Sequence, residues 1–376
     1  MIRFIIKPLD VLFFGSGRPF NLGDVSKSNF PPYTHTFAGA ISAIFNTSNP
    51  QVITNIYGPF LYNQKDRQTY FPKPANIYKR RKKENLDKLF TIDPVPDEIF
   101  ILLKYKNTNI PYGVENLCID TTGEDLEPFQ GIISEEGLKK WIKSENPDPS
   151  EIKSFSEVFE YENRIGIKVD PNRNTVVDED GLYRIRFIRI REEWSFVVYV
   201  KFNQSNNNLF NKIGYQKKDE EVDEETLENK IVDYLNNNKN VIKIGGEMKN
   251  ACYEVDIVKN PFANFQFPNV SNSKYIKILF LNHSLVDLHN LEGLKTISYI
   301  INGYSNLVIY SNKIGMKKFG FRTINPGTVA YVIPNQNNLD LKKFWFNNIN
   351  INIQPEEKNV FKLQFCINFV TLGIKN

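Results

Sequence analysis

The clearest grouping of side chains suited to chemistry is a basic and aromatic run at residues 312–323, which reads NKIGMKKFGFRT. It carries Lys313, Lys317, Lys318 and Arg322 and no acidic residue. Cations neutralise phosphates, aromatic faces stack on unpaired bases, and glycines let backbone N–H groups approach closely. The run therefore indicates nucleic-acid binding, although an exposed hairpin with ordinary lysines explains it equally well.

His35 is the one histidine whose neighbours suggest a chemical role, because it lies between Thr34 and Thr36 at the expected start of a helix. A histidine with a pKa near neutrality can act as general base on a ribose 2′-hydroxyl. It can also stack on a base or donate to a phosphate at a helix N-terminus, or simply pack on Tyr33. No obvious general acid accompanies it, so we favour binding or structure over catalysis.

Further cations lie in a glycine loop and in two strand-like segments. Residues 15–20 read GSGRPF and carry Arg18, a candidate phosphate or base contact. Residues 162–168 read ENRIGIK and carry Arg164 and Lys168.

In the second strand-like segment the arrangement of arginines matters more than their number. Arg184 and Arg186 are expected to share one face because side chains alternate along a strand, and Arg189 and Arg191 the other.

Metal, cofactor and nucleophile chemistry have no local signature. The histidines stand at 35, 283 and 289 and the cysteines at 118, 252 and 366, with no ligand-like spacing. We expect His283 and His289 to be surface or half-buried side chains. There is no GxSxG, GxxxxGK[ST] or GxGxxG motif. The sequence therefore predicts no metal and no cofactor.

Composition places the chain among globular proteins of two or three domains. Of 376 residues, 41% are hydrophobic and 24% charged, and 47 basic residues against 43 acidic ones leave a net charge of +4. That charge is too small to identify a partner. No apolar stretch is long enough for a membrane span, and residues 1–8 lack the features of a signal peptide. We expect a cytoplasmic protein with no membrane partner.

The elements expected to position these residues follow the order strand, helix, two strands, helix, strand of a ferredoxin-like unit. Thr34 or Thr36 can cap the first helix, and Leu227, Ile231 and Leu235 show the spacing of the second. This order requires residues 51–155 to be an insertion after the first helix. The strands are expected at 2–6, 164–169, 182–190, 194–202, 241–244 and 251–258.

The last third repeats the pattern weakly and predicts a degraded second unit. The expected fold class is thus α+β, with two ferredoxin-like (RRM-like) domains at residues 1–262 and 263–376. The large insertion lies in the first of them.

Taken together, the motifs resemble those of a known family. They are PLDVLFF at 8–14, GRPF at 17–20, FPP at 30–32, TFAGA at 36–40, ENRIGI at 162–167, GLY at 181–183, GGE at 245–247 and NPGTV at 325–329. In this order the sequence resembles RAMP-superfamily subunits of type III CRISPR effectors, and most nearly the third subunit of the type III-B (Cmr) complex.

That resemblance implies a non-catalytic subunit that binds the crRNA. Such a subunit holds the repeat-derived 5′ tag of the guide and contacts the large polymerase-like subunit and the backbone RAMP subunits. The implied tag-binding surfaces are the loop at 17–20, the helix start at 35–36, the strand at 164–168 and the glycine-rich stretch at 315–327. The implied RNA-binding residues are Arg18, Phe20, His35, Thr36, Arg164, Lys168, Lys317, Lys318 and Arg322.

Two alternatives remain open at this point. One is a metal-independent endoribonuclease of the same superfamily that cleaves repeat RNA with His35 as base. The other is a protein-interaction module whose RNA contacts are incidental.

Overall fold

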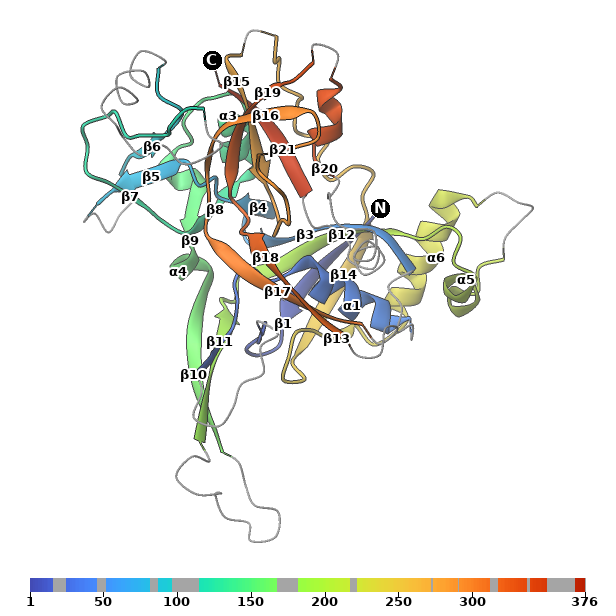
Figure 1. Ribbon diagram of the computed structural model, residues 1–376. Coiled ribbons are helices and arrows are strands. Elements are labelled where there is room, and N and C mark those ends of the chain that lie inside the picture. The colour runs from blue at the N-terminus through green and yellow to red at the C-terminus, as the bar shows by residue number, and fades with distance from the viewer. Residues whose placement is uncertain are drawn as a thin grey trace.

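The computed structural model describes most of the chain. The described residues are 1–15, 25–45, 52–81, 87–96, 115–167, 182–216, 222–271, 273–289, 291–311, 317–336, 339–349 and 369–375. They form a mixed α+β fold with several antiparallel sheets, the fold class expected from the sequence (Figure 1). No helix among these residues is long and apolar enough to cross a membrane.

The largest sheet has eight strands in the order β13-β14-β1-β12-β3-β4-β8-β9. Their bounds are Val241–Lys243 (β13), Asn250–Ile257 (β14), Ile2–Pro8 (β1), Trp194–Phe202 (β12), Ile53–Asn63 (β3), Gln68–Pro72 (β4), Gly131–Ser134 (β8) and Ile152–Ser154 (β9). Five α-helices accompany the described strands: α1 (Thr34–Ile44), α3 (Glu135–Ile142), α4 (Phe155–Val158), α5 (Asn207–Ile213) and α6 (Glu224–Asn236).

The centre of this sheet has the succession β1-α1-β3-β12-α6-β14, and its four strands lie side by side as β14-β1-β12-β3. Every neighbouring pair is antiparallel. This is the strand, helix, two strands, helix, strand order of a ferredoxin-like unit. The predicted helix is present as α6, which buries Leu227, Ile231 and Leu235.

The second strand of that unit is not where the sequence predicted it. It is β3, which begins just inside the region assigned to an insertion and pairs with β12 along its length. Gly58 has φ +102° and precedes Pro59, and the β12 register shifts opposite them, between Val197 and Tyr199. Proline and glycine inside a strand obscure its sequence pattern, which is why β3 was missed. Helix α1 also differs, since its N-cap is Tyr33 without a side-chain cap, and Thr34 instead donates to the Gly58 carbonyl (2.6 Å).

The strands predicted near residues 164–169 and 182–190 form a separate small sheet. It has the order β10-β11-β2, from Phe159–Ile167 (β10), Leu182–Ile190 (β11) and Val25–Lys27 (β2). Figure 1 shows β10 and β11 as a long pair that projects from the body of the molecule. A second small sheet consists of β5 (Ile77–Arg80), β6 (Leu89–Thr91) and β7 (Leu126–Pro128).

The C-terminal third forms a five-stranded sheet and a hairpin. The sheet order is β16-β19-β15-β21-β20, from Leu294–Ile300 (β16), Val329–Pro334 (β19), Tyr275–Phe280 (β15), Phe369–Lys375 (β21) and Asn347–Asn348 (β20). The hairpin joins β17 (Tyr304–Ser311) and β18 (Lys317–Ile324). The described residues after 262 contain no α-helix, only the 3-10 turn η4 (Leu341–Phe344), which differs from the expected second unit.

The large sheet has a hydrophobic cluster on each face, and it shares one of them with the five-stranded C-terminal sheet. One face of the large sheet packs on α1 and α6 through residues such as Phe4 and Phe196. The other face, with Val197 and Tyr199, packs together with Tyr331 of β19. Residues 51–155 take part in this junction, because Asn76 donates to the Tyr331 hydroxyl (2.9 Å). The C-terminal third is therefore fixed against the large sheet.

Candidate nucleic-acid interface

A groove of about 610 Å³ lies where four segments of the chain meet. Its lining residues are Phe13, Phe14, Gly15, Tyr33, His35, Thr36, Gly39, Ala40, Ala43, Lys243, Gly245, Gly246, Asn306 and Leu307. They come from the segment after β1, from one side of α1 between its N-cap and its last turn, from the end of β13 with the turn that follows, and from strand β17. Within the described part of the chain, none of the residues that line the groove is acidic.

In one wall of the groove, two glycines of the β13–β14 turn lie directly against the backbone of Phe13. Gly245 has φ +74°, and a Cβ there would lie 2.5 Å from the Phe13 carbonyl oxygen. The Gly246 N–H donates to that same oxygen (2.8 Å). On the opposite wall, a Cβ on Gly39 would meet no atom within 4 Å, so this face of α1 is open to the groove. Gly245 thus lets the β13–β14 turn pack directly on the backbone of Phe13, whereas the backbone of α1 at Gly39 is open to a ligand in the groove.

His35 lies in the groove wall and is neutral at physiological pH. Burial lowers its pKa to about 4, and its ring centroid is 5.5 Å from that of Tyr33. A base with so low a pKa is a weak proton acceptor at neutral pH. Its neutral ring is suited to stacking or to hydrogen bonding with a base. Thr36 lines the groove beside it, so the structure brings both predicted residues of the helix start to one cavity.

His283 completes an aromatic cluster that the sequence did not predict. Its ring centroid is 4.1 Å from that of Tyr33. Burial, reinforced by the neighbouring His35, lowers its pKa to about 3. The expectation of a surface or half-buried histidine is wrong here, since only 5% of His283 is exposed. Isolated in the sequence after β15, it carries no signal that it packs on the start of α1.

The basic and aromatic run predicted at 312–323 contributes strand β18 of the hairpin beside the groove. Its partner strand β17 supplies Asn306 and Leu307 to the lining, and Asn306 pairs with Arg322 across the hairpin. The Arg322 guanidinium lies over the Tyr304 ring, 4.1 Å from its centroid. An antiparallel pair projects on the same face, so Arg322 shares the face of Asn306.

The two predicted lysines of β18 lie at the far end of the same hairpin. Lys317 pairs with Ser311 and Lys318 with Tyr310 along the backbone, and their side chains lie outside the described part. Of the basic run, the structure thus describes the backbone of residues 317–323 and the side chain of Arg322, whereas Lys313 lies outside the described residues.

Arg164 lies in a different place, inside a charge network at the base of the β10–β11 pair. Its guanidinium contacts Glu162 (2.7 Å) and Asp10 (3.1 Å). Arg189 bridges the same two carboxylates, and Lys249 approaches Asp10 at 3.9 Å. Hydrogen bonds from Arg164 and Arg189 lower the pKa of Glu162. The Arg164 charge, which the resemblance implies to be in the RNA-binding surface, is thus paired with two carboxylates of the chain itself.

Three other predicted residues, Arg18, Phe20 and Lys168, lie outside the described residues. Within the described ranges no group of three or more His, Cys, Asp or Glu side chains could hold a metal ion.

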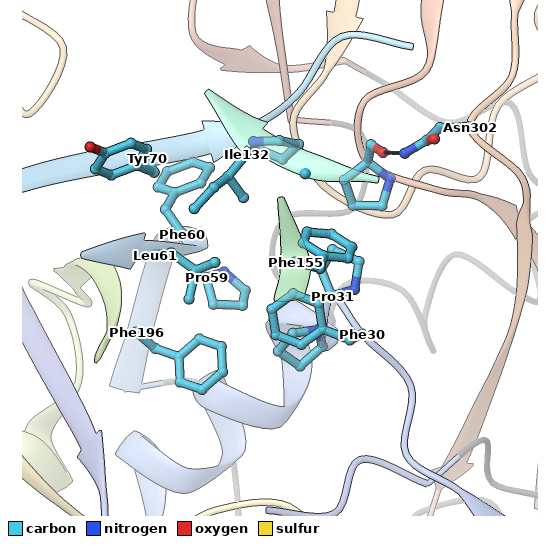
Figure 2. A pocket seen from close by; sticks show the side chains of 14 residues that line it. Phe30, Pro31, Pro59, Phe60, Leu61, Tyr70, Ile132, Phe155, Phe196 and Asn302 are labelled. Carbon is cyan, nitrogen blue, oxygen red and sulfur yellow. Dashed lines mark hydrogen bonds between the residues drawn. The ribbon is translucent and has the colours of Figure 1, made fainter. Parts of the chain in front are cut away.

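A second cavity, at the junction of the two sheets, is too small for a ligand. Figure 2 shows its apolar lining, which includes Phe30, Pro31, Pro59 and Phe155, with Asn302 at its edge. Asn302 donates to the Pro326 carbonyl (2.6 Å). The cavity volume is about 20 Å³, roughly the space of one water molecule. It is a packing space, so the groove is the better candidate for ligand binding.

Comparisons with known proteins give a family for the chain. No curated protein matches it. Among solved structures, type III-B Cmr-beta bound to cognate target RNA contains a chain with 17% identity and a TM-score of 0.46, covering 96% of this chain and 95% of that one. State 1 of Cmr-beta bound to cognate target RNA and AMPPnP contains a chain with 17% identity and a TM-score of 0.44, and the match covers 88% of this chain and 86% of that one. The Csm3–Csm4 subcomplex of the type III-A CRISPR-Cas interference complex contains a chain with 14% identity and a TM-score of 0.34, and the match covers 88% of this chain and 92% of that one.

The family comparison covers well over half of the sequence. A family profile described as CRISPR-associated protein (Cas_Cmr3) matches residues 4–281, a range that contains α1, the β13–β14 turn and all of the large sheet except the first two residues of β1. The chain belongs to this CRISPR-associated Cas_Cmr3 family.

Proposed function

We propose that the chain is a non-catalytic crRNA-binding subunit of a type III-B (Cmr) CRISPR effector complex. In this proposal it holds the repeat-derived 5′ tag of the guide and links the large polymerase-like subunit to the backbone RAMP subunits. Membership of the Cas_Cmr3 family supports the type of complex. The observation that carries the RNA-binding role is the groove, in which the glycine turn, the start of α1 and the basic hairpin meet.

The groove offers separate contacts for phosphates and bases. Helix α1 has no side-chain cap, and although the Thr36 N–H donates to the Tyr33 carbonyl (3.1 Å), the N–H groups of Thr34 and His35 before it suit an anion at the helix N-terminus. Lys243 is an exposed cation in the lining. The neutral His35 ring and the Arg322–Tyr304 pair offer flat surfaces on which a base can stack. Contacts of these two kinds suit a short single-stranded RNA segment.

The fold is consistent with two RAMP domains at residues 1–262 and 263–376. The first contains the ferredoxin-like succession around β1 and β12, elaborated by strands between residues 51 and 155. The second keeps an antiparallel sheet and the β17–β18 hairpin. Because the groove takes residues from both parts, we infer that the tag is held between the two domains.

The endoribonuclease alternative has less support. A general base works best with a pKa near the operating pH, and burial holds the pKa of His35 at about 4. No carboxylate among the described residues lines the groove to serve as acid. Incubation with repeat RNA tests this directly: the intact strand is expected to persist without metal, whereas cleavage that His35→Ala abolishes would establish the nuclease.

The binding proposal is tested by filling the groove. In Gly39→Glu, a carboxylate enters the groove from a position where a Cβ meets no atom within 4 Å. We expect its affinity for an RNA that carries the repeat-derived 5′ tag to fall by about tenfold or more through charge and steric exclusion. The matched control is Gly39→Ala, which adds one methyl group and leaves the cavity open. Equal affinities of Gly39→Glu and wild type, with both folded, would refute the groove as the tag site.

A further inference from the structure

The imidazole of His35 is mostly buried by the protein and yet lines the RNA groove. It is neutral at physiological pH, so one ring nitrogen carries a proton and the other a lone pair. Within the described part of the chain, neither nitrogen has a hydrogen-bond partner. A buried polar group without a partner costs free energy, which a ligand regains by supplying the missing hydrogen bond. The described chain thus leaves a recognition group open to the groove.

Neighbouring rings hold this group in place. The Tyr33 ring lies 5.5 Å from the His35 ring between centroids, and the Tyr33 ring in turn packs on the buried His283 (4.1 Å). The backbone of residue 35 belongs to the first turn of α1. A group that is fixed before its ligand arrives loses little conformational entropy on binding. The edge of the His35 ring is therefore a pre-positioned part of the groove wall.

A candidate phosphate site lies directly beside this ring. The N–H groups of Thr34 and His35 begin helix α1 without a side-chain cap, and Lys243 is an exposed cation of the same groove. In a ribonucleotide the 2′-hydroxyl and the 3′-phosphate are bonded to neighbouring carbons of the ribose. A strand whose phosphate binds at the helix N-terminus therefore brings an adjoining 2′-hydroxyl near the His35 ring.

The groove also has room for a sugar at this place. Gly39 lies one turn after His35 on the same side of α1, and a Cβ there would meet no atom within 4 Å. A ribose that follows the helix from its N-terminus meets no side chain at Gly39. The ring edge of His35 and the open backbone at Gly39 together suit a sugar.

The chemistry of a neutral imidazole matches a hydroxyl better than a phosphate. A hydroxyl both donates and accepts, so it can pair with either ring nitrogen. A phosphate oxygen only accepts, and it gains most from a cationic donor. The edge of a base suits Asn306 of β17 instead, because its exposed amide lines the groove and has no described partner. The two side chains thus divide the sugar and the base between them.

We propose that His35 is the residue by which the groove selects ribose over deoxyribose, through a hydrogen bond between its ring edge and the 2′-hydroxyl of one bound nucleotide. A DNA strand of the same sequence leaves that ring nitrogen unpaired. The contact involves no covalent step, since the proton of the hydroxyl is shared and not removed. This inference rests on the proposed function, because it takes the groove to hold the 5′ tag of the guide.

The test is a double-mutant cycle between the side chain and the sugar, measured as affinity of the full chain at pH 8. The probes are RNAs with the repeat-derived 5′ tag in which the 2′-hydroxyl of each tag nucleotide is replaced in turn by hydrogen. For the wild type, we expect one of these changes to lower affinity by about three- to tenfold. His35→Phe, which keeps a ring without nitrogens, should lower affinity for the all-ribose RNA by a similar factor and be insensitive to that deoxy change.

Two further variants control for indirect effects. His35→Leu also removes both nitrogens and should be as insensitive as His35→Phe, so the result does not depend on the folding of one variant. Asn306→Ala changes a different polar group of the same groove. It should weaken the all-ribose RNA and the critical deoxy RNA by equal factors, because it leaves the contact at His35 intact.

The inference is overturned if no deoxy change weakens binding to the wild type, or if each change costs as much in His35→Phe and His35→Leu as in the wild type. Cleavage of the RNA during the assay would also overturn it, in favour of a nuclease. If Gly39→Glu weakens RNA binding while the cycle is additive, only this inference fails and the tag site stands. A wild-type chain that binds no tagged RNA would refute both.

Discussion

The ring of His283 lies against the ring of Tyr33, with 4.1 Å between their centroids, and so joins the C-terminal third of the chain to the first residue before helix α1. Since Tyr33 lines the groove, the position of this wall depends on a residue 250 positions away in the sequence. The RNA groove is therefore a product of the packing between the two parts of the chain.

Removal of this ring is expected to loosen both the fold and the groove. His283→Ala should lower the free energy of unfolding by about 2 kcal/mol, because it leaves a cavity beside Tyr33. His283→Phe, which keeps a ring, should stay within about 1 kcal/mol of wild type. Denaturant unfolding measures both. Equal loss in the two variants would show that the imidazole itself, and not its packing, is what matters.

Acid should destabilise the protein because both buried histidines are neutral when folded. Their folded pKa values, about 4 for His35 and about 3 for His283, lie below the ordinary value of 6.5. The unfolded state thus binds more protons below about pH 6.5, so stability falls as the pH drops toward the folded values. Each histidine should contribute about 2 kcal/mol of loss between pH 7 and pH 5.

The control for this pH effect is the same cluster with His283 replaced and His35 kept. His283→Phe should remove the contribution of His283 to the fall in the free energy of unfolding between pH 7 and pH 5, as measured by chemical unfolding at each pH. RNA affinity should change little between pH 6 and pH 8, because His35 stays neutral throughout. A slope that is unaltered in His283→Phe would contradict the buried, neutral state of this side chain.

The two groove walls should respond oppositely to the same substitution. Gly245→Ala forces a side chain into a φ of +74° with its Cβ 2.5 Å from the Phe13 carbonyl oxygen, and should cost about 2 kcal/mol of stability. Gly39→Ala, in open space on α1, should stabilise by roughly 0.5–1 kcal/mol. Thermal unfolding of the two variants checks this. A neutral Gly245→Ala would mean that the turn does not hold Phe13 in this way.

Neutralising the cations of β18 should weaken RNA binding in a salt-dependent manner. Arg322→Gln should lower affinity for 5′-tagged RNA by about three- to tenfold and reduce the slope of log affinity against log salt by about one. Lys317→Gln/Lys318→Gln should act in the same direction. Lys295→Gln, on β16, serves as the control. Affinity that is insensitive to all three changes at β18 would remove the hairpin from the RNA site.

The sequence predicts elements with a clear apolar pattern, and it fails where backbone geometry or distant packing decides. Helix α6 carries regular apolar spacing and strand β12 an almost unbroken apolar run, and both were predicted. Strand β3 was hidden by Gly58 and Pro59, although they belong to its irregular pairing with β12. His35 and Arg322 could be singled out by type and neighbours. His283 could not, because only the packing of the C-terminal third brings it to Tyr33.

Charge on a strand does not by itself show which partner a side chain has. The arginines of β11 alternate between faces as predicted, and the structure shows that the two faces differ in their partners. Arg189 is bridged to Asp10 and Glu162, which are far apart in the sequence. Arg184 forms no ion pair with a described carboxylate. Sequence spacing predicts the face of a side chain, and only the fold supplies its neighbours.

The measurement that tests the central claim most directly is photo-crosslinking of a guide RNA whose 5′ tag carries 4-thiouridine, followed by identification of the crosslinked peptides in the assembled complex. The account predicts crosslinks to the groove, at residues 33–40, 243–246 or 304–307. Crosslinks from the tag to β10 and β11, or to other subunits only, would contradict it.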